Sequence, residues 1–150
     1  MSGFETDQGI PKITEFDMAG TESVPQPVSF VETITVKDGV ECDTYTFDED
    51  PSRDLAVVRV LCAHKTPLQR VVDGVRTTEG YINGEGTLRV ASQDGEVRVY
   101  EFGPGCENRP VDVGVGDVMQ WEAYGVTDLT FFEVCVPPYE DGRFEDLIEK

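Results

Sequence analysis

The chain has 150 residues, of which 30 are Asp or Glu, 12 are Lys or Arg and one is His, so its formal charge is −18 at pH 7. This length suits one domain, and a hydrophobic content of 39% argues against intrinsic disorder. Without a basic face the chain is not expected to bind nucleic acid. No apolar run approaches the roughly 18 residues of a membrane span, so no membrane association is expected.

Residues 1–27 are polar and weakly periodic, with Pro11, Pro25 and Pro27 among them. They predict an N-terminal arm that either lies over a surface or is disordered. Residues 1–9 lack the basic and apolar parts of a signal peptide, so we expect a cytoplasmic protein. Its acidity fits both a salt-rich cytoplasm and ordinary acidic solubility.

Four cysteines are present, Cys42, Cys62, Cys106 and Cys135. None forms a CxxC pair, which excludes a zinc ribbon. In a cytoplasm they are expected to be reduced thiols. Cys62 and Cys135 lie inside apolar runs, which predicts that both are small core residues.

From residue 28 onward, short apolar or alternating runs are separated by turn residues. The predicted strands cover about 29–37, 40–47, 55–63, 67–72, 75–82, 86–92, 96–102, 111–121 and 127–136. Asp38-Gly39, Asp73-Gly74 and Asp94-Gly95 each lie between two such runs. Asp-Gly supplies the positive φ angles of a tight turn, so each pair predicts a β-hairpin. Only the tail, with Phe144, Leu147 and Ile148, has a helix-like spacing.

The runs 55–63 and 129–136, which lie within two of the predicted strands, have apolar side chains on nearly both faces, apart from Thr130 and Glu133 in the second run. Such strands have one face in a core and the other against another sheet or a partner, so we expect a homodimer. Many short strands with turns between them indicate a sandwich or a barrel.

Two stretches carry a family resemblance. Residues 79–88 (EGYINGEGTL) consist of a strand, a glycine bend and a strand, and Val115-Gly116-Asp117-Val118 precedes residues 129–138 (LTFFEVCVPP) after a short gap. In order and spacing they resemble the two motifs of the cupin superfamily, and residues 66–69 resemble the strand that enters the first motif. The resemblance covers residues 55–138. It implies an all-β protein with a single cupin-like double-stranded β-helix, or jelly-roll barrel, at residues 28–138, an N-terminal arm and a short C-terminal tail at 139–150.

Within this resemblance, Gly84 and Gly86 are expected to bend the chain at a barrel corner, and Gly116 to supply a positive φ. Metal-binding cupins carry three histidines and a glutamate. With Gly84 as the anchor the glutamate position is Thr77, with Gly86 it is Glu79, and the histidine of the second motif falls on Thr127. At most one of four ligands is present, so no metal and no cofactor are expected.

Two weaker possibilities concern His64, the single histidine. With Cys62 and Glu79 it could form an atypical three-ligand metal site, as in a metal-dependent cupin enzyme. The sugar-nucleotide epimerases of the superfamily use a His base and a Tyr acid, so His64 with Tyr81 or Tyr124 could form an isomerase or epimerase site. The plainer alternative is that His64 caps a strand end.

The leading hypothesis is a metal-free barrel that binds a small polar molecule of the sugar or carboxylate type. Thr77, Glu79 and Tyr81 share one strand face. Gln69 and Arg70 on the preceding strand point opposite ways, so only one faces inward, and Arg70 could pair with Glu79. Trp121 is placed to stack on a ligand or to cap the core. The expected ligand-binding residues are therefore Gln69, Arg70, Glu79, Tyr81 and Trp121. A structural dimer with a filled barrel is a further alternative.

Overall fold

The computed structural model of the protein describes residues 12–18 and 24–149. These residues form strands and loops but no helix, and so contain none that could cross a membrane. The strands, in chain order, are β1 (Glu15–Phe16), β2 (Gln26–Lys37), β3 (Val40–Phe47), β4 (Asp54–Val60), β5 (Gln69–Val71), β6 (Arg76–Gly84), β7 (Gly86–Ala91), β8 (Val97–Phe102), β9 (Val111–Gly114), β10 (Val118–Ala123), β11 (Leu129–Val136) and β12 (Phe144–Asp146).

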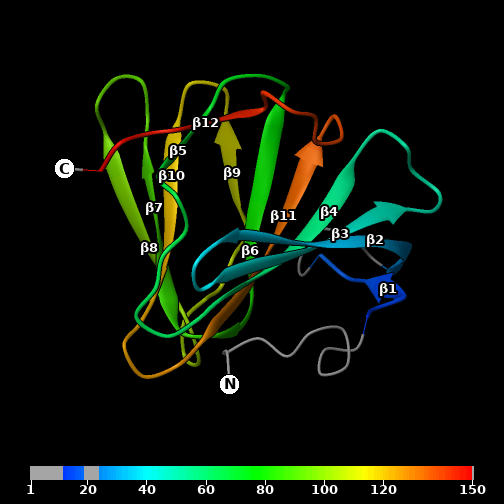
Figure 1. The fold of residues 1–150 in the computed structure, drawn as a ribbon, viewed down its shortest axis with the longest axis horizontal. Coiled ribbons are helices and arrows are strands. Elements are labelled where there is room, and N and C mark those ends of the chain that lie inside the picture. The colour runs from blue at the N-terminus through cyan, green and yellow to red at the C-terminus, as the bar shows by residue number, and fades with distance from the viewer. Residues whose placement is uncertain (1–11, 19–23, 150) are drawn as a thin grey trace.

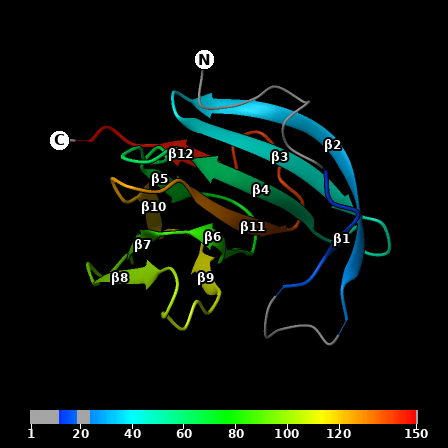
Figure 2. The ribbon, with the colours of Figure 1, turned by 90° about the horizontal axis from the view of Figure 1, so that it is seen from below.

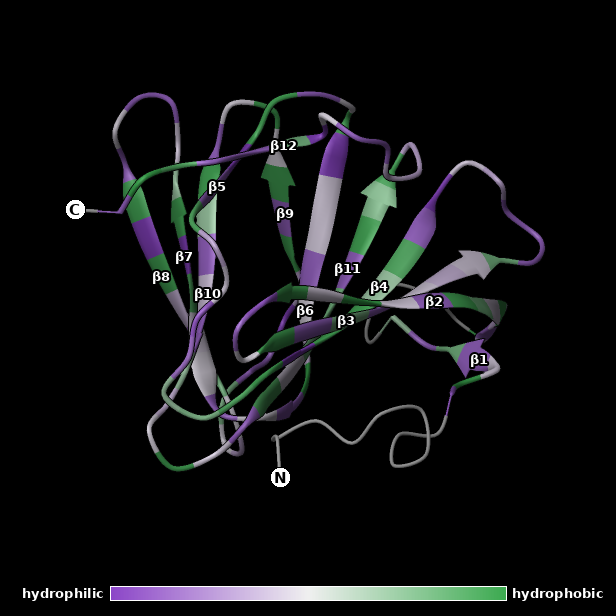
Figure 3. Cartoon of the chain, in the orientation of Figure 1, coloured by the Kyte–Doolittle hydropathy of each residue, from purple (hydrophilic) through white to green (hydrophobic). Residues whose placement is uncertain are grey.

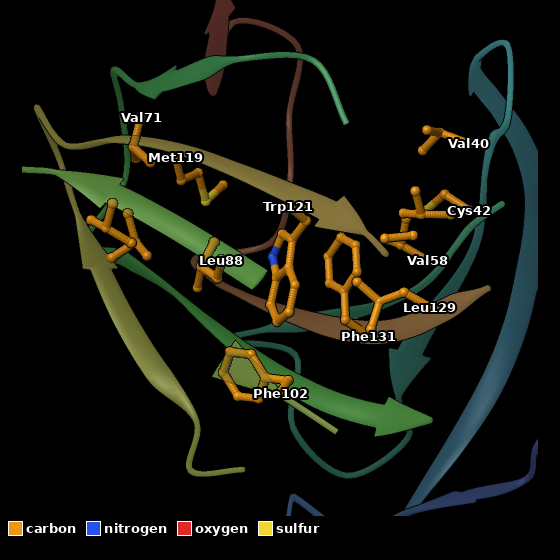
Figure 4. Close-up of a cluster of buried hydrophobic side chains, with 14 residues drawn as sticks. Val40, Cys42, Val58, Val71, Leu88, Phe102, Met119, Trp121, Leu129 and Phe131 are labelled. Atoms are coloured by element: carbon orange, nitrogen blue, oxygen red, sulfur yellow. The ribbon is translucent and has the colours of Figure 1, made fainter. Parts of the chain in front are cut away.

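The strands make two antiparallel sheets that face each other (Figures 1 and 2). One has seven strands in the order β1-β2-β3-β4-β11-β6-β9, and the other has five in the order β12-β5-β10-β7-β8. Side chains from both sheets fill the space between them, and Figure 4 shows Trp121 of β10 between Phe131 of β11 and Phe102 of β8. The expected all-β jelly roll is confirmed.

Each predicted strand overlaps an observed strand, with three differences. The range 111–121 is two strands, β9 and β10, which belong to different sheets and are joined by a turn at Gly116 with φ +96°. β1 was not expected. The tail forms β12 rather than a helical turn, because its backbone pairs with the edge of β5.

Two of the three Asp-Gly hairpins are confirmed. Asp38-Gly39 joins β2 to β3, and Asp94-Gly95 joins β7 to β8; both glycines have positive φ. The prediction of a hairpin at Asp73-Gly74 is wrong, because β5 and β6 lie in different sheets. Gly74 still has φ +94°, but its turn carries the chain from one sheet to the other.

The corner at Gly84 and Gly86 is confirmed, since it carries the chain from β6 in one sheet to β7 in the other. A Cβ atom on Gly84 would lie 1.9 Å from the carbonyl oxygen of Asp128, and one on Gly86 would lie 2.3 Å from that of Glu122. Only glycine permits so close an approach of backbone to backbone.

A second apolar cluster lies on the outer face of the seven-stranded sheet, where Phe16 packs edge-on against Phe132 with ring centroids 4.9 Å apart. Lys12, from the same N-terminal segment, lies 3.2 Å from the buried Asp43. Residues 12–18 therefore cover the outer faces of β4 and β11 with the chain's own side chains. The two-sided apolar pattern of these strands does not require a partner chain.

The four cysteines are free thiols, as expected. Cys135 is buried, which confirms its place in the interior. Cys62 is exposed rather than in the core, because β4 ends at Val60 and the chain turns outward there.

Candidate functional site

The inner face of the seven-stranded sheet carries polar side chains at one end of the core. Strand register places Thr44, Ala56, Glu133 and Glu79 opposite one another across β3, β4, β11 and β6. The next row toward the strand ends consists of Thr46, Asp54, Cys135 and Thr77. We call these eight residues the inner polar rows. Side chains alternate along a strand, so both rows face the same way as the core residues Val58 and Phe131.

Exposure falls along the first row. Thr44, Ala56 and Glu133 remain partly exposed, whereas Glu79 is 0% exposed, as is Thr77 beside it. β6, which carries both buried residues, is largely neutral to hydrophilic in Figure 3, unlike its neighbours β9 and β11. The row therefore runs from solvent to a buried polar end.

Glu79 is held by Trp121 across the barrel. The indole Nε1 donates a hydrogen bond of 2.8 Å to Glu79 Oε1. Trp121 is itself 2% exposed and stacks on Phe131 with ring centroids 4.2 Å apart. A donor fixed in a packed core holds its acceptor in one orientation, so the carboxyl group of Glu79 is rigidly placed.

Glu133 lies directly opposite Glu79. Burial raises the pKa of Glu79 well above its usual value, and the neighbouring charge of Glu133 raises it further. Burial also raises the pKa of Glu133. Two ionised carboxylates can only accept hydrogen bonds and repel each other, so such a pair shares one proton. Glu79, which has no contact with solvent, is the group that retains it.

Two buried atoms at this end of the rows, Oε2 of Glu79 and Oγ1 of Thr77, have no well-formed hydrogen bond among the described residues, although Thr77 and Glu133 both lie close enough to affect the pKa of Glu79. Buried polar atoms without a partner are uncommon, and each costs about 1–3 kcal/mol. The shared proton can satisfy the carboxyl oxygen. The hydroxyl of Thr77, which helps to lower the pKa of Glu79, can also accept a hydrogen bond.

Asp54 and Cys135 are neighbours in the second row. Burial raises the pKa of Asp54, although its carboxylate accepts a hydrogen bond of 2.9 Å from the backbone N–H of Tyr139. Burial also raises the pKa of the Cys135 thiol, as does the charge of Glu133, whose carboxylate lies 3.8 Å from the sulfur. Cys135 is therefore a neutral, poorly nucleophilic thiol.

Of the five predicted ligand-binding residues, two contact each other in the interior, and the polar groups of the other three are bonded elsewhere. Glu79 and Trp121 are together in the interior. Tyr81 faces the same core, but its hydroxyl donates to the carbonyl oxygen of Gly84 at 2.8 Å. Gln69 lies on the same face of its sheet as Val71 and Met119, yet its amide donates to Asp146.

Arg70 pairs with Glu145 of β12 at 3.0 Å on the exposed outer face of the five-stranded sheet. The predicted ion pair between Arg70 and Glu79 is therefore wrong. β5 belongs to the opposite sheet from β6, which adjacency in the sequence could not reveal.

Sequence reasoning missed Glu133, Asp54 and Cys135. Glu133 did leave a signal, because it is the one acidic residue in the apolar run 129–136. An isolated acid in such a strand faces either solvent or a polar interior. Its register with Glu79 was not available from the sequence.

No family model and no curated protein sequence matches the chain. Solved structures do. The capsular polysaccharide assembling protein CapF from Staphylococcus aureus superposes with a TM-score of 0.61 at 18% identity, over 82% of this chain and 35% of its own. A mutant of Bacillus subtilis oxalate decarboxylase superposes with a TM-score of 0.64 at 19% identity, over 78% of this chain and 30% of its own. Both are cupin-fold proteins.

The protein has the cupin fold. The chain spans about a third of the length of these neighbours. At this level of identity the likeness concerns the fold alone.

Some cupins hold metals, such as the Mn(II) centres of Bacillus subtilis oxalate decarboxylase. The residues of this cupin barrel do not fit such a centre. The described residues contain no group of three His, Cys, Asp or Glu side chains placed to hold a metal ion. Glu79 is bonded to an indole, and the single histidine lies elsewhere.

His64 lies at the turn after β4, with Nδ1 3.0 Å from the carbonyl oxygen of Cys62 and Nε2 3.9 Å from Asp38. This is the strand-end position considered above as the plainer alternative. Tyr124, the second phenol considered with it, donates to Glu101 at 2.9 Å. The imidazole and the two phenols thus have separate partners, and no contact favours an epimerase-type pair.

Proposed function

We propose that this cupin-fold protein binds a small polar molecule of the sugar or carboxylate type inside its barrel, at the inner polar rows. One observation carries the proposal: Glu79 is 0% exposed, bonded to Trp121 and paired with a second acid at the end of a row that reaches solvent. A barrel needed only for packing gains nothing from such a pair, because buried ionisable pairs can usually be replaced by apolar side chains without loss of stability.

Among the two ligand types, the charge of the rows supports a neutral sugar. Asp54 and Glu133 lie beside the protonated Glu79, and their negative charge repels a carboxylate. Sugar hydroxyls both donate and accept, which matches the hydroxyl of Thr77 and the carboxylate of Glu133. The free thiols support a place in the cytoplasm.

Ligand-observed NMR at pH 7 tests the proposal, with a panel of neutral monosaccharides and the uronic acid of each. We expect at least one neutral sugar to bind. Glu133→Gln should weaken that binding about tenfold or more, because a charge-assisted hydrogen bond contributes about 1.5–3 kcal/mol.

Glu122→Gln is the matched control, since Glu122 is an exposed acid on β10 beside Trp121. It should leave binding unchanged. Equal loss in both variants contradicts a site at the rows. Failure of every compound to bind supports a structural dimer with a filled barrel instead.

We also propose a homodimer formed along the edge of β2. β1 pairs only with Gln26 and Pro27, which leaves most of that edge without a partner in the described residues. Ile34 and Val36 on this stretch are 40% and 42% exposed. The strand's one acid, Glu32, is balanced by Lys37, so it is locally neutral in a chain of charge −18. A long, apolar, uncharged edge favours pairing with another edge.

Light scattering after size exclusion at 0.5 M salt tests the dimer. The unmodified protein should be a dimer, and Ile34→Lys should raise its dissociation constant about tenfold or more, since lysine blocks edge pairing. Val97→Lys on β8, where Val97 is 50% exposed, is the control and should stay dimeric. A monomeric unmodified protein contradicts the proposal.

A further inference from the structure

Residues 137–149 cross one end of the barrel from sheet to sheet. In Figure 1 this segment runs over the strand ends from β11 to β5. It contains β12, which pairs with β5 through three residues, Phe144 to Asp146. We call residues 137–149 the C-terminal strap.

The strap passes over the second of the inner polar rows. The backbone N–H of its Tyr139 donates to Asp54, a member of that row. Beneath it, Cys135 is 2% exposed and Thr77 is 0% exposed. Glu133 and Glu79 lie two residues deeper along the same strands. The strap therefore closes the barrel end nearest to the paired acids.

One side chain of the strap is fully buried, that of Arg143 at 3% exposure. Its guanidinium donates to the carbonyl oxygens of Pro137 at 2.7 Å, Val136 at 2.8 Å and Arg76 at 3.0 Å. It also packs on Gly74, where an added Cβ atom would lie 2.3 Å from Arg143 Cζ. Arg143 thus ties the strap to the ends of β11 and β6.

Arg143 forms no ion pair with any carboxylate of the described residues. Its charge still acts on the inner polar rows, where it works against burial to lower the pKa of Asp54 and of Glu133. Here its hydrogen bonds go to backbone at the place where the strap meets the sheet. Arg143 therefore links the strap to the ends of β11 and β6 through backbone hydrogen bonds rather than through an ion pair.

The strap is also held by backbone hydrogen bonds, including those from Val72 N–H to the carbonyl of Arg143 and from Leu147 N–H to that of Leu68, and by Phe144, which packs against the core. Its ion pairs are weak. Arg70 pairs with Glu145, and Lys65 with Glu149, and all four side chains are substantially exposed. Exposed ion pairs contribute about 0–1 kcal/mol each. A segment with few buried side chains and exposed hydrogen bonds opens more readily than the strands below it.

We propose that the C-terminal strap is a movable closure of the barrel, that Arg143 is its latch, and that its release admits small molecules to the inner polar rows. The role in admission rests on the proposed function, whereas the opening itself does not. The strap thereby regulates access to Glu79 and Glu133.

The cysteines provide a direct test by N-ethylmaleimide labelling at fixed pH, read by peptide mass spectrometry. In the unmodified protein the exposed Cys62 and Cys106 should react quickly, and the buried Cys42 and Cys135 slowly. Arg143→Gln should speed the labelling of Cys135 about tenfold or more and leave Cys42 unchanged. The charge of Arg143 lowers the pKa of Cys135, so its removal alone slows the reaction, and acceleration reports access.

Arg70→Gln is the control variant, because it breaks only an exposed ion pair. It should change Cys135 labelling little. Equal acceleration of Cys42 and Cys135 in Arg143→Gln, or acceleration of neither, overturns the latch.

If Arg143→Gln fails to fold, amide hydrogen exchange of the unmodified protein still tests whether the strap opens. The amides of residues 144–147 should exchange faster than those of β11. Equal protection overturns the closure. Neither measurement uses a ligand, so a failure here leaves the proposed binding function standing, and a failure of the sugar panel leaves the strap standing.

Discussion

Trp121→Ala is expected to lower the free energy of unfolding by about 3–5 kcal/mol, the range for truncating a buried aromatic residue. Trp121 is among the largest fully buried side chains and packs against both Phe131 and Phe102. Its loss leaves a cavity between the sheets and removes the donor that holds Glu79. Urea unfolding followed by circular dichroism measures the change.

Trp121→Phe separates packing from hydrogen bonding. Phenylalanine keeps a stacking ring but has no N–H, so it leaves Glu79 Oε1 without its donor. The expected loss is about 1–3 kcal/mol, the cost of a buried group left unsatisfied. Stability equal to that of the unmodified protein would show that the indole bond contributes nothing.

Glu79→Gln is expected to stabilise the protein at pH 7 by about 1–4 kcal/mol, because keeping a proton on a buried acid above its unfolded pKa costs about 1.4 kcal/mol for each pH unit. Glutamine has the shape of a protonated glutamic acid. Its carbonyl can accept from Trp121, and its amide can donate to Glu133. The variant therefore keeps both interactions and needs no proton.

The sign of the pH dependence follows from the raised pKa of Glu79. Between the unfolded value of 4.5 and the higher folded value, the folded state binds more protons than the unfolded state. The stability of the unmodified protein therefore rises as the pH falls through this window. The advantage of Glu79→Gln should shrink from pH 7 toward pH 4.5.

Unfolding curves of both proteins at several pH values measure this difference. Glu122→Gln makes the same chemical change at an exposed position, so it controls for the substitution itself and should give no comparable gain. Below pH 3.8 the buried Asp43 acts in the opposite direction. Although its burial alone raises its pKa, hydrogen bonds from Arg59 and Thr33 lower it overall, so its contribution is lost in acid. If the difference in unfolding free energy between Glu79→Gln and the unmodified protein does not change with pH, the raised pKa of Glu79 is contradicted.

Local chemistry was enough to predict most strands and several turns. Alternating apolar residues made β3 and β7 recognisable, and Asp-Gly located the turns of the β2–β3 and β7–β8 hairpins. These features depend on residues close together in the chain, through side-chain alternation and positive φ angles. The glycine corner before β7 and the apolar character of β11 likewise depend only on residues close together in the chain. They were sufficient for the all-β fold and for placing Glu79 and Trp121 in the interior.

Contacts between distant segments were decided only by the tertiary structure. Glu79 and Glu133 are 54 positions apart and meet through strand register, which periodicity within one strand does not specify. Because β5 and β6 belong to different sheets, the turn at Asp73-Gly74 crosses between the sheets instead of closing a hairpin. For the same reason Arg70 does not reach Glu79 and pairs with Glu145 on the outer face of its sheet. Arg143 found its acceptors on backbone carbonyls, which carry no residue type for a sequence pattern to detect. The sequence by itself therefore determined which segments form strands and which way their side chains alternate. The tertiary structure decided which strands are neighbours, and with them the paired acids and the closure above them.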